Sequence, residues 1–195
     1  MKKVVKRWVE SCEECQKRSS RMPKELGNAS GEPTLFGRVS LDVVHMKASP
    51  WKYLVVARDD LSGWVETQSL RKLSALKVQE FFMNNWVYRY GAIKIITVDG
   101  GSEFQGEVAS AARGVGAKLV KTTPYWPQAA GQVERGHQPI KDALVKMCGG
   151  NGKKWQDHLQ LVTWADRILT WRSTGYSPYE VLFFQAPVLP IDIEE

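Results

Sequence analysis

The chain has 195 residues, a formal net charge of +6 and 43% hydrophobic residues. This length and apolar content suit one main domain with a real core and leave little room for a second. No apolar run reaches the roughly 18 residues that a membrane span needs, and the basic N-terminus lacks the apolar segment of a signal peptide, so we expect no membrane association and no secretion.

The positive charge is concentrated at the N-terminal end. The first 25 residues hold eight Lys or Arg and four Glu, whereas the rest of the chain holds 19 basic and 17 acidic residues. A basic arm beside a nearly neutral core suits a polyanionic partner. An ordinary solvated basic helix explains the same charges and stays open as an alternative.

Residues 3–20 have a helical pattern that contains Cys12 and Cys15. A Cys-x-x-Cys pair is half of a zinc site, but no histidine precedes Cys12. Because structural zinc sites use four ligands, we do not expect this chain alone to bind zinc, and two exposed thiols are the favoured interpretation. Residues 21–36 are rich in Pro, Gly, Ser and Asn, which predicts a linker.

Three strand signals follow the linker, at about residues 38–46, 52–59 and 63–69. The connection 60–62 between the last two has hairpin length, so three antiparallel strands are predicted. Asp59 and Asp60 fall at this turn. Carboxylates at turns commonly bond their own backbone, and we expect that role for both rather than a metal role.

The rest of the chain predicts alternating helices and strands. Apolar residues from Leu76 to Tyr90 follow helical spacing, with Gly91 as the C-terminal cap. The elements expected after it are a strand at 93–98, a short helix at 104–114, a strand at 117–122, and helices at 153–171 and 177–184. The apolar residues expected in the core of the last two are Trp155, Leu159, Leu161, Val162, Trp164, Ile168 and Leu169. This order implies a mixed sheet covered on both faces.

Three acidic residues stand within or beside these apolar elements. Asp42 interrupts a buried strand, Asp99 follows the β-branched run 95–98, and Glu134 lies near the start of a helix. That helix has an apolar face formed by Val133, Ile140, Leu144 and Met147, and an opposite face that Glu134 shares with Gln138, Lys141 and Val145. Converging carboxylates repel one another unless cations lie between them, and a pair of hard divalent ions is the usual remedy. Such a site performs phosphoryl chemistry.

Short motifs surround the acids, and 34 residues separate Asp99 from Glu134. The motifs are Asp99-Gly100-Gly101-Ser102-Glu103-Phe104, Tyr125-Trp126-Pro127-Gln128, Gly131-Gln132-Val133-Glu134-Arg135 and Ser173-Thr174-Gly175-Tyr176-Ser177-Pro178-Tyr179. Together they resemble the catalytic core of retroviral and retrotransposon integrases, most closely those of Gypsy-type long-terminal-repeat (LTR) elements. The resemblance covers nearly the whole chain.

This resemblance implies an α/β fold of the RNase H-like type, with a mixed five-stranded sheet flanked by helices and a short N-terminal helical remnant. It divides the chain into a truncated zinc-module remnant and linker at 1–35, an integrase catalytic core at 36–190 and a C-terminal tail at 191–195. Cys12 and Cys15 resemble the second half of the His-His-Cys-Cys zinc module of these integrases.

The activity that the resemblance implies is that of an LTR-retrotransposon polynucleotidyl transferase, which processes DNA 3′ ends and transfers them into target DNA with two Mg²⁺ or Mn²⁺ ions. Asp42 would bridge the ions, Asp99 would bind one and Glu134 the other. Tyr125, Gln138 and Lys141 would contact DNA. The implied partners are element ends, target DNA and further copies of the chain, in the nucleus of a eukaryotic host.

The sequence departs from the family pattern at three points. Gly100 stands where Asn is usual, the spacing between the second and third acids is commonly one residue longer, and Pro139 removes a helix hydrogen bond, so a kink is expected. Two alternatives stay open: a catalytically inactive, element-derived DNA-binding protein, and an RNase H-type nuclease. The presence of all three acids argues against the first, and the Tyr125 and Ser173 motifs argue against the second.

Overall fold

The computed structural model describes residues 34–46, 49–98, 106–121, 138–149, 153–171 and 174–193. By its internal contacts the chain separates into two units, Met1–Glu32 and Pro33–Glu195, and all described residues belong to the second. The predicted helix at 3–20, with Cys12 and Cys15, lies outside the described residues, as do Asp99, Tyr125 and Glu134.

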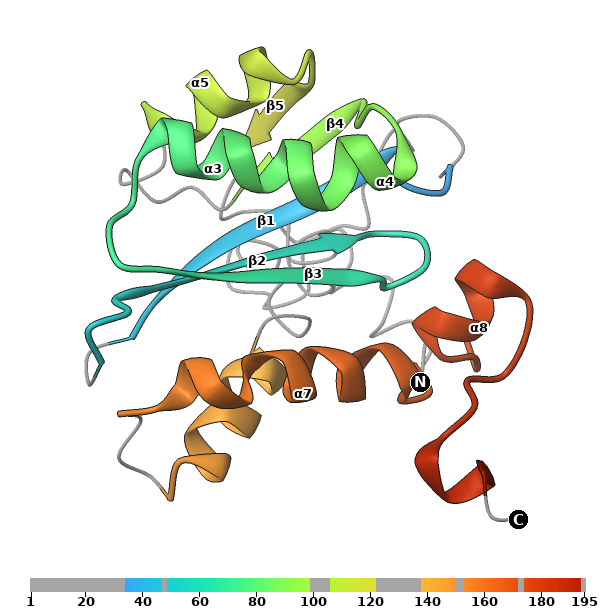
Figure 1. The fold of residues 1–195 in the computed structure, drawn as a ribbon. Coiled ribbons are helices and arrows are strands. Elements are labelled where there is room, and N and C mark those ends of the chain that lie inside the picture. The colour runs from blue at the N-terminus through green and yellow to red at the C-terminus, as the bar shows by residue number, and fades with distance from the viewer. Residues whose placement is uncertain are drawn as a thin grey trace, which may run out of the picture. The chain divides into compact units, whose positions relative to one another are not determined.

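A mixed five-stranded sheet organises the described unit (Figure 1). Its strands are β1 (Arg38–His45), β2 (Tyr53–Asp59), β3 (Val65–Leu70), β4 (Ile95–Val98) and β5 (Lys118–Lys121). They lie in the order β3-β2-β1-β4-β5. The β3–β2 and β2–β1 pairs are antiparallel, and the β1–β4 and β4–β5 pairs are parallel. The predicted strands are confirmed, and β1 is the central strand.

Helices cover both faces of the sheet (Figure 1). One face carries α3 (Ala75–Phe82), the π-helical turn η1 (Met83–Val87), α4 (Tyr88–Tyr90) and α5 (Glu107–Gly114). The other carries the helical segment 138–147 and α7 (Trp155–Ile168). α8 (Pro178–Phe183) and the 3₁₀ turn η3 (Pro190–Ile193) follow in the chain, and Phe183 of α8 contacts the buried Trp64. Gly91 caps α4 with φ of 95°, as predicted, whereas the π turn inside the predicted helix was not anticipated. Among the described helices, none is long and apolar enough to cross a bilayer.

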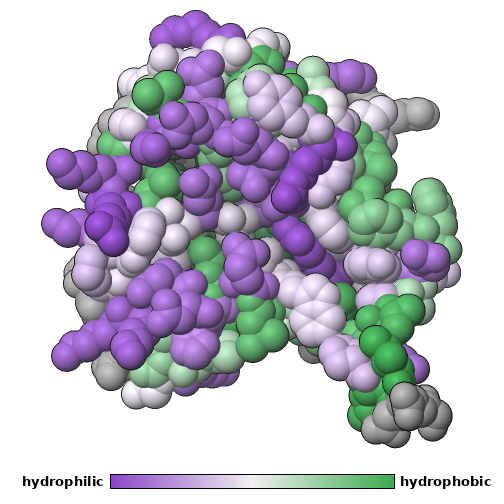
Figure 2. Space-filling view, viewed as in Figure 1, coloured by the Kyte–Doolittle hydropathy of each residue, from purple (hydrophilic) through white to green (hydrophobic). Residues whose placement is uncertain are grey.

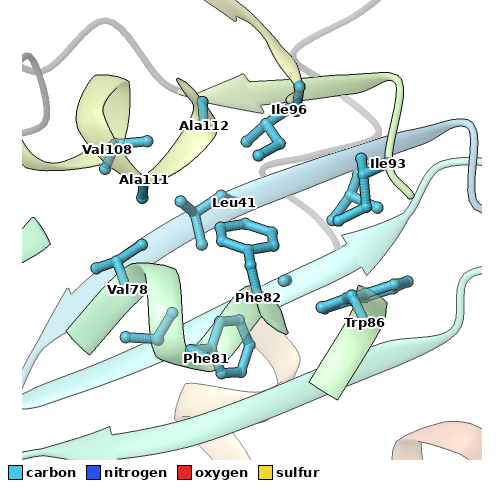
Figure 3. Close-up of a cluster of buried hydrophobic side chains, with 14 of the residues drawn as sticks. Leu41, Val78, Phe81, Phe82, Trp86, Ile93, Ile96, Val108, Ala111 and Ala112 are labelled. Carbon is cyan, nitrogen blue, oxygen red and sulfur yellow. The ribbon is translucent and has the colours of Figure 1, made fainter. Parts of the chain in front are cut away.

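The larger core lies between the sheet and the α3–α5 layer (Figure 3). Leu41 and Ile96 of the sheet pack there with Phe82, Trp86 and Val108, and all five are almost completely buried. Alternate residues of β1, Val39, Leu41 and Val43, contribute to this core because side chains of a strand point to opposite faces in turn. Each large apolar side chain buried in this way stabilises the fold by about 1.5–3 kcal/mol.

The second core lies on the opposite face of the sheet. Val56 and Met46 pack there against Ile140, Leu144 and Trp155. Even-numbered positions of β1 therefore face the segment 138–147 and α7, which places Asp42 on this face. Ile140 and Leu144 are buried as predicted, but Met147 at the end of the segment is exposed.

The predicted core of α7 is wrong in part. Trp155, Leu159 and Val162 are buried, whereas Leu161, Trp164 and Leu169 are exposed by 52%, 38% and 65%. Thr163 is buried in their place, with its hydroxyl bonded to that of Thr67 at 2.6 Å and to the Leu159 carbonyl. The helix packs through one face only, so the apolar residues of its other face stay in solvent.

The β2–β3 turn is organised by Asp59, which is fully buried. Its carboxylate accepts hydrogen bonds from the backbone N–H of Phe36 (2.9 Å) and from the backbone N–H and hydroxyl of Ser62 (2.8 and 2.7 Å). Burial raises the pKa of Asp59, although these hydrogen bonds oppose the shift. Asp60 accepts from the Ser40 hydroxyl at 2.6 Å. Hydrogen bonding to the turn, as predicted, is confirmed for Asp59.

Glu66 connects the helix layers around the edge strand β3. Its buried carboxylate forms ion pairs with Arg167 of α7 at 2.8 Å and Arg89 of α4 at 3.1 Å. It also accepts hydrogen bonds from the Tyr90 hydroxyl and the Trp64 indole N–H, both at 3.1 Å. Burial, followed by the Glu66 charge, raises the pKa of Tyr90.

Candidate active site

Asp42 occupies the central strand at the end of the described β1–β4 ladder. The last pair of that parallel ladder joins Leu41 to Val98, which is also the last residue of β4. Asp42 follows Leu41 directly and is half-buried in a strand whose preceding residues are buried. Asp99 follows Val98 in the sequence and lies outside the described residues.

The environment of Asp42 is set by its position between two apolar layers. On β2 it pairs with Val56, a fully buried member of the second core. That core includes Ile140 and Leu144, so the segment 138–147 packs on the face toward which Asp42 is oriented. The strand thus presents a carboxylate on the face that carries the helix expected to follow Glu134.

Two of the predicted DNA contacts lie on that segment. Gln138 is exposed and donates from its amide nitrogen to Asp142 at 2.7 Å, and Lys141 is half-buried. Pro139 is the second described residue of the segment, so the predicted kink concerns residues that lie outside the described part of the chain. The structure brings Gln138 and Lys141 onto one element; their DNA contacts stay a prediction.

Of the three predicted metal ligands, the structure describes only Asp42. Across the described ranges, no group of three or more His, Cys, Asp or Glu side chains is placed to hold a metal ion. A half-buried carboxylate is nevertheless a suitable oxygen donor for a hard divalent cation. The described part of the site therefore fits such an ion, and Asp99 and Glu134 remain predicted ligands.

A pair of buried hydroxyl residues flanks Asp42 on the same face. Ser40 pairs with Thr97 across β1 and β4, and both are at least nine-tenths buried. The Ser40 hydroxyl donates to Asp60, but among the described residues the Thr97 hydroxyl has no hydrogen-bond partner. Nothing in the sequence marks Thr97 as special, because a threonine inside a β-branched run is what any buried strand contains.

Comparison with known sequences identifies homologues among retroviral polyproteins. The Pol polyprotein of feline endogenous virus ECE1 and the Gag-Pol polyprotein of baboon endogenous virus (strain M7) are each 30% identical over 195 residues, covering 95% of this chain. The Gag-Pol polyprotein of gibbon ape leukemia virus is 34% identical over 138 residues, or 70% of the chain. The chain spans only 18%, 11% and 8% of these three polyproteins. No protein-family model matches it.

Solved structures with a similar fold include retroviral integrases and their assemblies. The catalytic core domain of BIV integrase has a TM-score of 0.59 and 25% identity, covering 76% of this chain and 94% of that domain. A chain of the simian T-cell lymphotropic virus intasome has a TM-score of 0.69 and 18% identity, covering 97% of this chain and 69% of that one. The predicted fold is confirmed: it is the RNase H-like fold of integrase catalytic cores. The chain is homologous to part of retroviral Pol polyproteins.

Proposed function

We propose that this chain is an integrase catalytic core, a polynucleotidyl transferase that processes DNA 3′ ends and transfers them into target DNA. Its support is the homology to retroviral Pol polyproteins together with the fold of the BIV integrase core. One observation carries the proposal: the parallel register of Leu41 with Val98, which puts Asp42 and Asp99 at neighbouring positions of adjacent strands if the ladder continues by one residue.

Asp42, Asp99 and Glu134 would hold two divalent cations, Mg²⁺ or Mn²⁺. The cations would supply activation of the attacking oxygen and stabilisation of the leaving oxygen in an in-line displacement. The chain contributes the carboxylates and their rigid support. Asp42 sits on the central strand between two buried cores, which limits its movement and fixes where a phosphate can react.

The DNA contacts proposed for this reaction are Tyr125, Gln138 and Lys141. The side chains of Gln138 and Lys141 lie on a helical segment anchored to the sheet by Ile140 and Leu144. An anchored helix positions its polar residues more precisely than a loop does. The partners would be element ends and target DNA, in the nucleus of a eukaryotic host.

The type of genetic element from which the chain derives, and whether the chain is catalytically active, are also proposals. The relatives reported above are retroviral, which favours a retrovirus-type element; the narrower Gypsy-type resemblance remains a prediction for a phylogenetic test. The competing function is an inactive, element-derived DNA-binding protein. It shares the fold and the DNA partner, so only an assay of metal binding or of chemistry separates the two.

Self-association is part of the same proposal. Leu161, Trp164, Ala165 and Ile168 recur at helical spacing on the side of α7 opposite its buried residues, and each is exposed or half-buried. A second copy is the occupant we propose for this apolar stripe. Light scattering of Leu161→Glu should show fewer dimers than wild type, whereas Leu76→Glu, at an exposed leucine of α3, should not. Equal behaviour of both variants would contradict the assignment.

The function is tested by following thermal unfolding during a Mn²⁺ or Mg²⁺ titration. A ligand at a hundred times its Kd stabilises the folded state by about 2.7 kcal/mol, which for a chain of this size raises Tm by roughly 5–10 °C. Asp42→Asn, Asp99→Asn and Glu134→Gln should each lose most of this shift. The same shift in wild type and all three variants would show that these acids do not bind the metal.

A further inference from the structure

Basic and aromatic residues gather at the end of the sheet beyond Asp42. Tyr53 of β2 pairs with His45 of β1 and with Leu70 of β3, so these three residues form a row at one end of the antiparallel strands. Lys52 precedes Tyr53, and Arg71 and Lys72 follow Leu70. Because of this pairing, all three cations lie at the same end of the antiparallel strands, and all three are exposed.

Trp51 joins the start of α7 to the same end. Its backbone carbonyl accepts the indole N–H of Trp155 at 3.2 Å. Lys153 and Lys154 directly precede Trp155 and are exposed. We call the five cations Lys52, Arg71, Lys72, Lys153 and Lys154 the basic rim. Figure 2 shows many hydrophilic side chains gathered at the left of the view, the side on which α7 begins and the β1–β2 connection lies in Figure 1.

Arg71 is oriented by an aromatic ring. Its guanidinium carbon lies 4.7 Å from the centroid of the Trp51 ring. Two other described arginines lie over tryptophan rings, but Arg58 also bonds Asp166 and Arg167 also bonds Glu66. For Arg71, the described residues supply no carboxylate within ion-pair distance. The Trp51 ring thus orients this charge, and no carboxylate in the described ranges neutralises it.

This arrangement fits a phosphate backbone. A stacked guanidinium loses little further freedom when it bonds a phosphate oxygen, and its planar fork matches that geometry. Exposed lysines beside it add attraction by releasing counterions from DNA. The guanidinium of Arg71 covers a face of the half-buried Trp51 ring, and a covered face cannot stack on a base, so backbone contact is favoured over base recognition.

We propose that the basic rim binds the phosphates of duplex DNA a few nucleotides from the reacting phosphate. The inference rests on the proposed function, because it places the reacting phosphate at Asp42. His45 lies three residues beyond Asp42 on β1, which is roughly 10 Å along a strand. Successive base pairs rise about 3.4 Å along the duplex, so a duplex whose axis follows β1 would place its backbone at the rim about three nucleotides away.

The experiment measures binding of a fluorescent 20-base-pair duplex by anisotropy at several KCl concentrations. Two matched double variants remove the same charge: Arg71→Ala with Lys72→Ala in the rim, and Lys94→Ala with Lys118→Ala at the start of the parallel strands β4 and β5, the end of the ladder away from Leu41 and Val98, where both lysines are also exposed. The rim variant should weaken binding about tenfold at low salt and lower the slope of log K against log[salt] by roughly 2. The control variant should change the slope much less.

Equal slopes of log K against log[salt] for the two double variants would overturn the proposal that the basic rim binds DNA, since the effect of removing charge would then not depend on its position. If the Arg71 variant unfolds, Lys52→Ala with Lys72→Ala leaves the Trp51–Arg71 stack intact and should still lower the slope. Competition by polyglutamate as strong as by unlabelled duplex would also contradict phosphate recognition. The anisotropy assay measures DNA binding and does not depend on catalysis. If the rim variant lowers the salt slope as expected but the wild type shows no metal-dependent chemistry, the result would count against the catalytic proposal alone.

Discussion

Leu41 of β1 and Val98 of β4 are paired in parallel register, and each is followed in the sequence by an aspartate. Adjacent strands lie about 4.8 Å apart, so continuation of the register by one residue would set two carboxylates side by side. Two carboxylates at that distance disfavour joint ionisation unless a cation intervenes. On the proposed function, this relationship would explain why a cation is required between the two acids.

Removing one of the two charges should stabilise the metal-free protein. Asp42→Asn and Asp99→Asn are each expected to raise the unfolding free energy without divalent metal by up to about 1 kcal/mol, because the remaining acid loses a repulsive neighbour. Urea unfolding in the presence of a chelator measures this. Asp157→Asn, at an exposed position of α7, is the control and should change little. A loss of stability in both site variants would contradict the inferred repulsion.

The Glu66 cluster should be the most sensitive polar site in the described structure. Glu66→Gln removes the buried charge that pairs with Arg167 and Arg89 and should cost about 3–5 kcal/mol, because it leaves Arg167 largely buried without its anion. Arg89→Gln removes a half-exposed partner and should cost about 1 kcal/mol or less. Equal costs in urea unfolding would show that Glu66 does not act as the common acceptor.

Thr97 and Thr67 offer a matched test of buried hydroxyls, since each is 7% exposed. Thr97→Val removes a hydroxyl that has no partner within the described part of the chain and should stabilise by about 0.5–1.5 kcal/mol. Thr67→Val leaves the Thr163 hydroxyl with one bond fewer and should destabilise by a similar amount. Chemical denaturation of the two variants provides the comparison. A destabilised Thr97→Val would mean that the hydroxyl serves a partner in solution.

Acid should weaken the start of α8. Ser177 and Glu180 form a capping box, and hydrogen bonds from the Ser177 backbone and hydroxyl lower the pKa of Glu180. A lowered folded-state pKa contributes stability that is present above the ordinary value of 4.5 and is lost as the pH falls through the folded value. Glu180→Gln should therefore show a flatter stability profile below pH 4.5 than wild type. Parallel profiles would contradict the cap.

Much of the fold follows from local sequence patterns. The β-branched strands, the hairpin at Asp60 and the Gly91 cap each carry a short-range signal, and all three are found in the structure. The exposed side of α7 could not be predicted, because Leu161 and Trp164 have the same spacing and polarity as core residues. Their exposure depends on which elements pack against the helix, and periodicity within one helix does not contain that information.

For the candidate site, the sequence pattern predicted the place of Asp42 inside a buried strand, and this place is confirmed. The metal role of Asp42, and the parts of Asp99 and Glu134 that the resemblance implies, stay predictions. Thr97 and the stack of Arg71 on Trp51 were not predictable, because each depends on a contact between strands or connections. Such contacts become visible only when the register is known, as with the pairing of His45, Tyr53 and Leu70.

We propose that this chain performs phosphoryl transfer on DNA with Asp42 as a metal ligand. A gel assay tests this: a labelled branched oligonucleotide, which mimics a strand-transfer product, is incubated with wild type or Asp42→Asn in Mn²⁺, and the strands are resolved under denaturing conditions. Wild type should resolve the branch by transesterification, and Asp42→Asn should give no product while it remains folded. Equal product from both proteins would contradict the role of Asp42, and no product from wild type in Mn²⁺ or Mg²⁺ would support the inactive DNA-binding alternative.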